Sequence, residues 1–469
     1  MVPTQQASGR GGVSHPGPGA APTHPDLVGV VDRIRSFTGP GGTPPGFHLA
    51  VADLTAPAVP LPWQSDRQAF GMSWADADEA RRAAGGEAVE RHCGSWPPPA
   101  EQLLHGSYHE LARRGVAAVD PDSLTLYSPR QYAADGFPFR PFDRDTPVAW
   151  VPGRSAGRDR AVRIPAFLVH TFWARMPKPH PEPLIAFPAI GGIAAGPTLE
   201  QALLAGLEEV IERDAVAVWW ANAAPPPALP LTERIHRLLA PALDRYEIAL
   251  SLVGNGFGVP VLAASVRSRA ESWLTMGFAA RADPEQAALK ALAEAFGLQL
   301  TARALDDPAA VDRMVRGCAD RRSPLRPWRQ DRGYLDSYRA DCADVVELLC
   351  QQQLYLDPRA GDRALAWTGR GPETAWAQLP RLPERSFDVL RGRVEAAGFE
   401  VLYADLTRPP AAAAGMHAVR VVVPGLVGTA PAAYPYLGLD RVRAQATALG
   451  WRDAPLPEEA LNTFPAPHS

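Results

Sequence analysis

The chain has 469 residues, of which 46% are hydrophobic and 21% are charged, and its formal net charge is −4. This composition is typical of a globular protein that is long enough for one large or two ordinary hydrophobic cores. The charges form no long run of one sign, so nothing indicates a nucleic-acid-binding or membrane-binding surface. No stretch approaches the ~18 consecutive apolar residues of a transmembrane helix. We therefore expect a soluble, cytoplasmic protein.

The N-terminal segment and the cysteines point to the same conclusion. Residues 1–25 are rich in Gly, Pro, Ser and His and lack the apolar core of a signal peptide, which predicts a disordered tail before a folded region over 26–469. The four cysteines form neither a Cys-x-x-Cys pair nor a cluster with zinc spacing. We interpret them as reduced structural thiols. They are Cys93, Cys318, Cys342 and Cys350.

The first half of the chain alternates strand-like and helical segments. Strands are predicted at 27–37 and 47–54, helices at about 76–93 and near 101–114, and paired strands at 147–151 and 162–169. A glycine-rich turn at 191–196 leads into a second strong helix.

In the second half, a glycine-rich turn at 254–258 separates strands at 248–253 and 259–266 and predicts a hairpin. A strand at 272–279 precedes the third strong helix, and a helix at 386–397 precedes strands at 400–405 and 418–423. Residues 305–345 are rich in Arg and Asp and are predicted to form a surface insertion or lid. Because strand-to-helix units occur beside hairpins, we expect a mixed α/β fold whose sheets are not purely parallel.

One short pattern occurs three times and ends each time in a glutamate. Each copy starts with a residue that can cap a helix and has Glu or Gln three positions later, which is the capping-box arrangement. An alanine lies seven residues, or about two helical turns, before the final glutamate, so both share one face of the helix. The copies run from Asp76 to Glu87, from Thr198 to Glu209 and from Asp283 to Glu294.

Two copies continue with a second acid and an arginine. They read Glu87-x-x-Glu90-Arg91 and Glu209-x-x-Glu212-Arg213. One Glu-x-x-Glu-Arg alone is typical of a solvated helix face. These helices, however, are rich in apolar and small residues, and a buried carboxylate persists only when it is paired or bound to metal. The pattern therefore indicates a divided metal and phosphate site.

The turn before the second helix favours phosphate binding. Gly191, Gly192 and Gly196 precede a capped helix, where backbone amides and the helix dipole attract an anion. A tight structural turn is the alternative, because the sequence fits neither a Walker A loop nor a dinucleotide-binding fingerprint. Carboxylates that share phosphate oxygens suit Mg²⁺ better than zinc. We expect ATP and Mg²⁺ as cofactors.

With these motifs assembled, the chain resembles the YcaO family, and within it the azoline-forming cyclodehydratases that modify ribosomal peptides. The resemblance extends from about residue 26 to the C-terminus. It implies the YcaO fold, with largely antiparallel sheets flanked by helices and an ATP and Mg²⁺ site in a central cleft. The segments that carry it are 70–94, 137–151, 190–220, 277–296 and 419–428.

The resemblance implies a role for each motif residue. Metal binding is assigned to the five motif glutamates, Glu87, Glu90, Glu209, Glu212 and Glu294. Nucleotide contacts are assigned to Ser73, Arg91, Gly192, Gly196 and Arg213. The family loop begins Ser-x-Gly, whereas this chain has Ile190-Gly191-Gly192.

The C-terminal tail, residues 456–469, is expected to lie near the active site. Azoline-forming members end in Pro-x-Pro-x-Pro, whereas this chain ends Pro465-Ala466-Pro467-His468-Ser469 and lacks the last proline. The C-terminal carboxylate of Ser469 is thus a candidate catalytic group, and a passive tail is the alternative.

The implied reaction is ATP-dependent conversion of Cys, Ser or Thr in a precursor peptide to a thiazoline or oxazoline. A separate partner protein is expected to recruit the leader of the precursor. A homodimer of this chain is also possible. Two alternatives remain. One is a YcaO enzyme that installs a thioamide or an amidine, and the other is a non-catalytic scaffold that binds the peptide or the partner.

Overall fold

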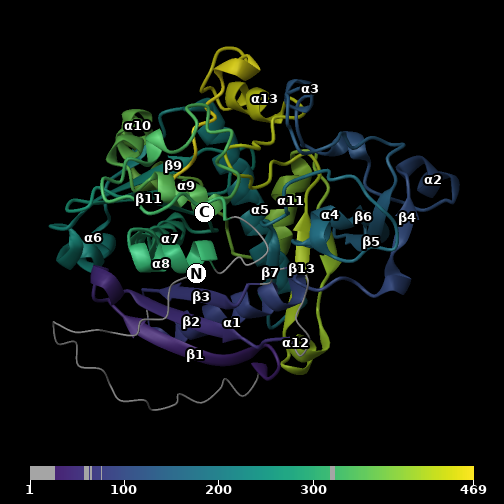
Figure 1. The fold of residues 1–469 in the computed structure, drawn as a ribbon, viewed down its shortest axis with the longest axis horizontal. Coiled ribbons are helices and arrows are strands. Elements are labelled where there is room, and N and C mark those ends of the chain that lie inside the picture. The colour runs from purple at the N-terminus through teal and green to yellow at the C-terminus, as the bar shows by residue number, and fades with distance from the viewer. Residues whose placement is uncertain (1–26, 58–62, 64–65, 75, 317–322, 469) are drawn as a thin grey trace.

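The computed structural model describes residues 27–57, 63, 66–74, 76–316 and 323–468. The predicted disordered tail, Cys318 and Ser469 lie outside these residues. Helices flank three sheets, and every pairing between the named strands of the described part is antiparallel (Figure 1). The predicted mixed α/β fold with antiparallel sheets is confirmed.

The first sheet has three strands in sequential order and is covered by the first motif helix. The strands are β1 (Val31–Thr38), β2 (His48–Leu54) and β3 (Gln68–Ser73). Helix α1 (Ala77–Gly94) packs against β2 and β3. The side chain of Asp76 accepts a hydrogen bond from the Glu79 amide at 2.6 Å, so the predicted cap is present.

The second sheet combines strands from the middle and the end of the chain. Its order is β4-β5-β12-β13-β7, and β6 pairs with β5. The bounds are β4 (Leu104–Gly106), β5 (Val148–Ser155), β6 (Arg160–Pro165), β7 (Ile193–Gly196), β12 (Leu402–Asp405) and β13 (His417–Val422).

Two predicted boundaries in this region are wrong. The helix expected near 101–114 is only the short α2 (Tyr108–Arg113), which Ser107 caps after strand β4. The strand expected over 162–169 ends at Pro165, and α4 (Ala166–Val169) follows. In the first place Ser107 caps a helix that begins only there, and in the second Pro165 ends the strand before an apolar helical turn.

The third sheet has the order β11-β10-β9-β8 and contains the predicted hairpin. Its strands are β8 (Ala228–Leu229), β9 (Tyr246–Val253), β10 (Val261–Ser268) and β11 (Leu274–Ala280). Helix α7 (Pro284–Leu305), the third motif helix, packs against β10 and β11.

The second motif helix, α5 (Leu199–Asn222), lies between the second and third sheets (Figure 1). It packs against β7 and β13 on one side and against β11 on the other. Helices α11 (Phe387–Ala396) and α13 (Arg441–Ala448) also contact it. The other helices are α3 (Pro129–Tyr132), α6 (Glu233–Leu239), α8 (Pro308–Arg316), α9 (Leu348–Leu354), α10 (Pro358–Thr368) and α12 (Pro409–Ala413).

The segment 305–345 is packed more deeply than its composition indicates. Tyr334, Tyr338 and Val345 are buried in the core that surrounds α5 and β11. The charged residues of the segment pair locally, for example Arg329 with Asp331 at 2.7 Å. A few large groups therefore anchor a segment whose average composition is polar, and its role as a surface insertion or lid stays a prediction.

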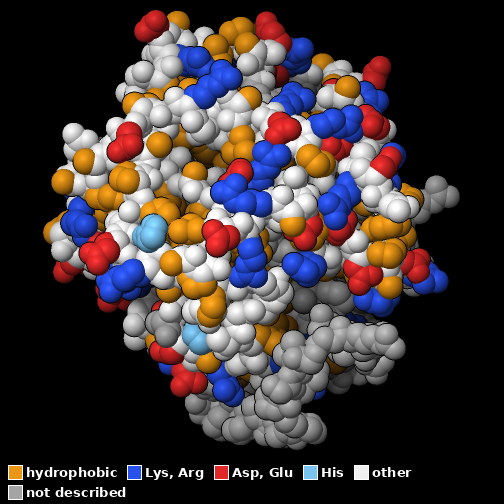
Figure 2. All heavy atoms as spheres, turned by 90° about the vertical axis from the view of Figure 1, so that its left-hand side faces the viewer, with side chains coloured by type: hydrophobic (Ala, Val, Ile, Leu, Met, Phe, Trp, Pro, Cys, Tyr) orange, Lys and Arg blue, Asp and Glu red, His pale blue; other side chains and the backbone are white. Residues whose placement is uncertain are grey.

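The surface agrees with the absence of long charge runs. On the face drawn in Figure 2, Lys and Arg side chains are interspersed with Asp and Glu side chains and form no continuous stripe. In the described part of the chain, no helix has the length and hydrophobicity that crossing a bilayer requires.

Candidate active site

The last glutamate of each motif is bound to a backbone amide next to its helix. In all three cases the glutamate accepts a hydrogen bond from a backbone amide. The amide belongs to a residue in, or directly before, the strand that precedes the helix. They are Phe70 N to Glu87 at 2.8 Å, Gly192 N to Glu209 at 2.9 Å and Phe278 N to Glu294 at 3.1 Å.

Glycine lets the helix lie close enough for this bond. A Cβ atom on Gly71 of β3 would lie 2.0 Å from the Ala80 carbonyl oxygen of α1. A Cβ atom on Gly277 of β11 would lie 2.1 Å from the Ala291 carbonyl oxygen of α7. No side chain fits at such distances, so glycine permits the close spacing between strand and helix that brings Glu87 and Glu294 to their amides.

Glu90 joins the first motif helix to the second sheet. Its Oε1 accepts a hydrogen bond of 3.0 Å from the amide of Ala195 in β7, 105 residues away in sequence. Burial and, to a lesser extent, the negative charges of Glu87 and Glu209 raise the pKa of Glu90 to about 8. The carboxyls of the first two motifs are therefore electrostatic neighbours.

Glu212 and Glu294 extend this cluster to the third motif. Glu212 is only 6% exposed, and burial raises its pKa to about 8 against the opposing charge of Arg213, with Glu294 and Glu209 adding to the rise. Burial also acts to raise the pKa of Glu294. Nearby positive charges outweigh this effect, first among them the Lys290 ammonium 3.7 Å away, and the pKa of Glu294 lies below its usual value. All five predicted acids thus gather in one region, with Glu209 in the middle.

The acids do not form a ready-made cage. In the described residues, no group of three or more His, Cys, Asp or Glu side chains is arranged to hold a metal ion. The assignment of the five glutamates to metal binding therefore stays a prediction. Three of them are instead held by the strand amides described above.

The two motif arginines lie beside their own acids. Arg91 is 2.9 Å from Glu87 and 3.3 Å from Asp66. Arg213 is largely buried and lies 3.6 Å from Glu209 and 3.4 Å from Glu212. Both guanidinium groups therefore border the acidic cluster as predicted.

Not every acid of α5 faces the cluster. Glu208 is 2% exposed and pairs with Arg385 at 2.8 Å and Arg281 at 3.0 Å. Asp214 is 1% exposed and pairs with Arg441. These two carboxylates connect α5 to other parts of the fold and are already neutralised there.

The predicted phosphate contacts are only partly supported by the geometry. Gly192 adopts a φ of 85°, and a Cβ atom on it would lie 2.5 Å from the Val421 carbonyl oxygen, so the turn requires glycine. Its amide donates to Glu209. Gly196 lies outside the turn, in β7 opposite His417, because Ile193–Gly196 pairs with β13. Ser73 is buried at the end of β3 and donates its hydroxyl hydrogen bond to Glu79.

Sequence reasoning missed Arg420, which holds the glycine-rich turn. This arginine of β13 is 1% exposed and donates hydrogen bonds to four carbonyl groups and one hydroxyl. A charged residue within the apolar run 418–423 was the available signal, because a buried guanidinium requires several partners. The acceptors are the carbonyls of Val169, Ala189, Ile190 and Gly191 and the hydroxyl of Thr171.

The C-terminal tail is docked against α5, α9 and β11. Four of its backbone carbonyl groups accept hydrogen bonds from residues of the surrounding core. They are Trp220 Nε1 to Phe464 O at 2.6 Å, Tyr355 hydroxyl to Pro465 O at 2.6 Å, Met276 N to Pro467 O at 2.7 Å and Gln351 Nε2 to His468 O at 3.0 Å.

His468 is the last described residue and reaches the cluster. Its Nδ1 lies 3.0 Å from the Met276 carbonyl, and its Nε2 meets the Arg213 guanidinium. Burial and the charge of Arg213 lower the pKa of His468 to about 4, so the imidazole is neutral at physiological pH. Ser469, the predicted catalytic residue, lies outside the described residues.

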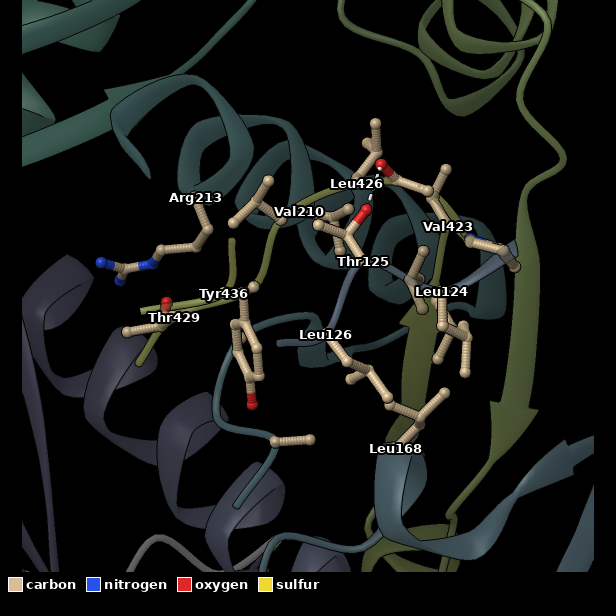
Figure 3. A pocket seen from close by; sticks show the side chains of 18 of the residues that line it. Leu124, Thr125, Leu126, Leu168, Val210, Arg213, Val423, Leu426, Thr429 and Tyr436 are labelled. Atoms are coloured by element: carbon tan, nitrogen blue, oxygen red, sulfur yellow. Dashed lines mark hydrogen bonds between the residues drawn. The ribbon is translucent and has the colours of Figure 1, made fainter. Parts of the chain in front are cut away.

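Two cavities of about 120 and 130 Å³ meet beside Arg213. The first is lined mainly by aliphatic side chains, among them Leu126, Leu168 and Val423 (Figure 3). The second lies between α5 and the tail residues 462–468. A substrate in either cavity would therefore lie next to the acidic cluster.

Comparison with known proteins gives a consistent assignment. A family model described as YcaO cyclodehydratase, ATP- and Mg²⁺-binding, matches residues 74–427. The chain is also 25% identical over 361 residues to an uncharacterized protein of Methanothermobacter thermautotrophicus, which covers 74% of this chain and 79% of that protein.

Three solved structures are similar in fold. A heterocyclase in complex with substrate and cofactor has a TM-score of 0.65 and 22% identity, covering 93% of this chain and 55% of that one. The heterocyclase TruD has a TM-score of 0.58 and 24% identity, covering 83% and 51%. YcaO from Methanopyrus kandleri, bound with AMPPCP and Mg²⁺, has a TM-score of 0.54 and 20% identity, covering 86% and 89%.

This chain spans about half the length of the two heterocyclases. The family model, in contrast, covers most of the chain and includes all five motif glutamates. The protein therefore belongs to the YcaO family, whose members bind ATP and Mg²⁺.

Proposed function

We propose that this protein is an ATP- and Mg²⁺-dependent cyclodehydratase that forms thiazolines or oxazolines from Cys, Ser or Thr in a ribosomally made precursor peptide. The observation that carries the proposal is the gathering of five motif glutamates from three helices beside Arg213 and two cavities. Family membership supports the cofactors, and the position of the cavities supports a second substrate next to them.

The acidic cluster fits a divalent cation. The Oε1 atom of Glu212 is buried and has no hydrogen-bond partner among the described residues. Repulsion among the acids contributes to the raised pKa values of Glu90 and Glu212, and a cation would relieve it. Mg²⁺ commonly uses one or two carboxylates together with water and phosphate oxygens, so a complete protein cage is not required. The residues that would hold it are Glu87, Glu90, Glu209, Glu212 and Glu294.

Bound Mg²⁺ would neutralise charge on the phosphates. The arginines of the two doubled motifs, Arg91 and Arg213, would contact phosphate oxygens, since guanidinium groups recognise phosphate through paired hydrogen bonds. Arg420 would hold the start of the glycine-rich turn in place, because it donates hydrogen bonds to the carbonyls of residues 189–191. The neutral His468 imidazole accepts a hydrogen bond from Arg213 and so fixes the direction of that guanidinium.

The proposed reaction proceeds at one amide of the peptide. The Cys, Ser or Thr side chain attacks the preceding amide carbon and loses its proton, and the amide oxygen takes the terminal phosphoryl group of ATP. The carbon–oxygen bond then breaks and releases inorganic phosphate, while the amide nitrogen loses its proton and forms the C=N double bond of the ring. The net products are ADP, phosphate and a peptide lighter by one water. Positioning is decisive, because an amide oxygen is a poor nucleophile.

A separate leader-binding protein is part of this proposal, as is action in the cytoplasm. The chain spans about half the length of the similar heterocyclases. If a separate protein recruits the leader, turnover should be slow until that partner is supplied.

Mass spectrometry of the precursor peptide tests the proposal. The peptide encoded beside this gene, incubated with this protein, its neighbouring gene product, ATP and Mg²⁺, should lose one water for each ring. Replacement of oxygen by sulfur would instead identify a thioamide-forming enzyme. A peptide of unchanged mass, together with no Mg²⁺-dependent nucleotide binding in calorimetry, would identify a non-catalytic scaffold.

A matched pair of variants on α5 links the chemistry to the cluster. Glu209→Gln should abolish ring formation and leave the thermal unfolding midpoint, Tm, nearly unchanged, because the amide oxygen can still accept from Gly192. Glu200→Gln is the control, since Glu200 is exposed in the first turn of the same helix. Full activity of Glu209→Gln would contradict the assigned role.

A further inference from the structure

The two cavities share a small set of lining residues at their junction. Five residues line both cavities, and three of them have polar side chains, namely Arg213, Thr429 and Tyr436. The Tyr436 hydroxyl already donates to the Phe187 carbonyl at 3.2 Å, and Arg213 is engaged with His468 and with its motif acids.

Thr429 differs from these neighbours. Its Oγ1 atom is buried, and it has no hydrogen-bond partner among the described residues. Burying a hydroxyl without a partner destabilises a fold, so such a group at the junction of two cavities points to a ligand atom that would pair with it. Valine has nearly the same shape and would avoid this cost.

The surroundings of Gly191 locate the hydroxyl relative to the cluster. A Cβ atom built on Gly191 would lie 3.8 Å from Thr429 Oγ1, 3.3 Å from Arg213 Cγ and 3.7 Å from Glu209 Oε1. Thr429, Arg213 and Glu209 therefore surround one point of the glycine-rich turn. Figure 3 shows the Thr429 oxygen on the side of the residue that faces the Arg213 side chain.

We propose that Thr429 is a substrate-contacting residue whose hydroxyl donates a hydrogen bond to an anionic oxygen held beside Arg213. Two groups in the proposed reaction have this chemistry. One is a phosphate oxygen of ATP, and the other is the peptide amide oxygen, which becomes negatively charged when the amide carbon is attacked. The inference rests on the proposed function and assigns it a further binding residue.

Arg213 supports an anionic acceptor at the junction, where it also pairs with Glu209 and Glu212. The arginine at the junction favours a negative group, and a hydroxyl beside it strengthens binding because hydrogen bonds to charged acceptors are stronger than neutral ones. A neutral apolar ligand would leave the hydroxyl unpaired.

Thr429→Val and Thr429→Ser provide the test, because the first replaces the hydroxyl by a methyl group of similar size and the second retains the hydroxyl. Each variant is compared with the wild type in three measurements: Tm, calorimetric Kd for AMPPCP with Mg²⁺, and kcat and KM for the precursor peptide with its partner protein. We expect Thr429→Val to lose about 10-fold or more in kcat/KM, the effect of one hydrogen bond to a charged group. Thr429→Ser should stay within about 3-fold of the wild type.

The nucleotide measurement identifies the acceptor. If Thr429 holds a phosphate oxygen, Thr429→Val weakens AMPPCP binding. If it holds the amide oxygen, AMPPCP binding is unchanged and kcat falls. The Tm of Thr429→Val should be equal to or above that of the wild type, since an unpaired buried hydroxyl is removed.

Three results would overturn the inference. Wild-type values of both Kd and kcat/KM in Thr429→Val would show that the hydroxyl contacts no substrate. A loss of activity that follows a lowered Tm would show a structural role, as would failure of Thr429→Ser to retain activity. A wild-type protein that binds AMPPCP but forms no rings refutes the proposed function separately. In that case the Kd of Thr429→Val for AMPPCP alone tests whether Thr429 contacts a ligand. An unchanged Kd would overturn the assignment of Thr429.

Discussion

Replacing Glu90 by glutamine should stabilise the metal-free protein, and increasingly so as the pH rises. Burial and the neighbouring acids Glu87 and Glu209 raise the pKa of Glu90 to about 8, whereas its ordinary value is 4.5. The folded protein therefore holds a proton that the unfolded chain releases between these values. Stability is fully present below pH 4.5 and is lost as the pH rises toward 8.

The size of the effect follows from the same pKa. One pKa unit corresponds to about 1.4 kcal/mol, so raising the pH from 5.5 to 7.5 costs the folded state at most about 3 kcal/mol at Glu90. Partial exposure of the side chain reduces this figure, and we expect about 2 kcal/mol. Glutamine resembles the protonated acid and can still accept a hydrogen bond from Ala195, so the variant should escape this cost.

Thermal unfolding with EDTA and without nucleotide measures the difference. Glu90→Gln should already unfold slightly higher than the wild type at pH 5.5, and this Tm difference should increase by roughly 2–4 °C at pH 7.5. Saturating Mg²⁺ and AMPPCP should reverse the order, because a cation favours the ionised acid. Glu200→Gln is again the control. A Tm difference that is the same at both pH values would refute the reasoning.

Three further predictions concern the supports of the site. Arg420→Met should destabilise the protein by about 3 kcal/mol or more because several buried carbonyls lose their donor, and Arg420→Lys should recover part of this loss in thermal unfolding. Gly277→Ala should prevent native folding, as judged by circular dichroism, because the new Cβ would meet the Ala291 carbonyl, whereas Gly392→Ala, with no atom within 4 Å, should fold normally. Deleting residues 465–469 should lower kcat more than it weakens AMPPCP binding, and an unchanged kcat would show that the tail is passive.

The local elements of the site were predictable from sequence. The helix caps, the three motif glutamates and the hairpin before β10 depend on residues that are close together in the chain, and their chemistry is the same in any fold. The convergence of the acids was expected because the pattern recurs at a fixed offset in apolar helices. The gathering of Glu90 and Glu212 near Glu209 agrees with that expectation.

The long-range supports were not predictable from the same patterns. The amide that binds each motif glutamate depends on the distance between helix and strand, which Gly71 and Gly277 determine only after the chain has folded. Gly196 was assigned to the turn because strand β7 is too short to produce a recognisable alternation. The carbonyl partners of Arg420 come from segments about 230 to 250 residues earlier in the chain.

The opposite orientations of the acids on α5 affect how an alanine scan of this helix would be interpreted. Removing Glu208 or Asp214 would take away a buried carboxylate that ties α5 to arginines of other segments, and the protein would lose activity by unfolding. Such a variant would be scored as inactive in a screen, just like a variant that lacks a cofactor contact. Abundance and melting behaviour would have to be recorded for every position before a loss of product could be attributed to chemistry.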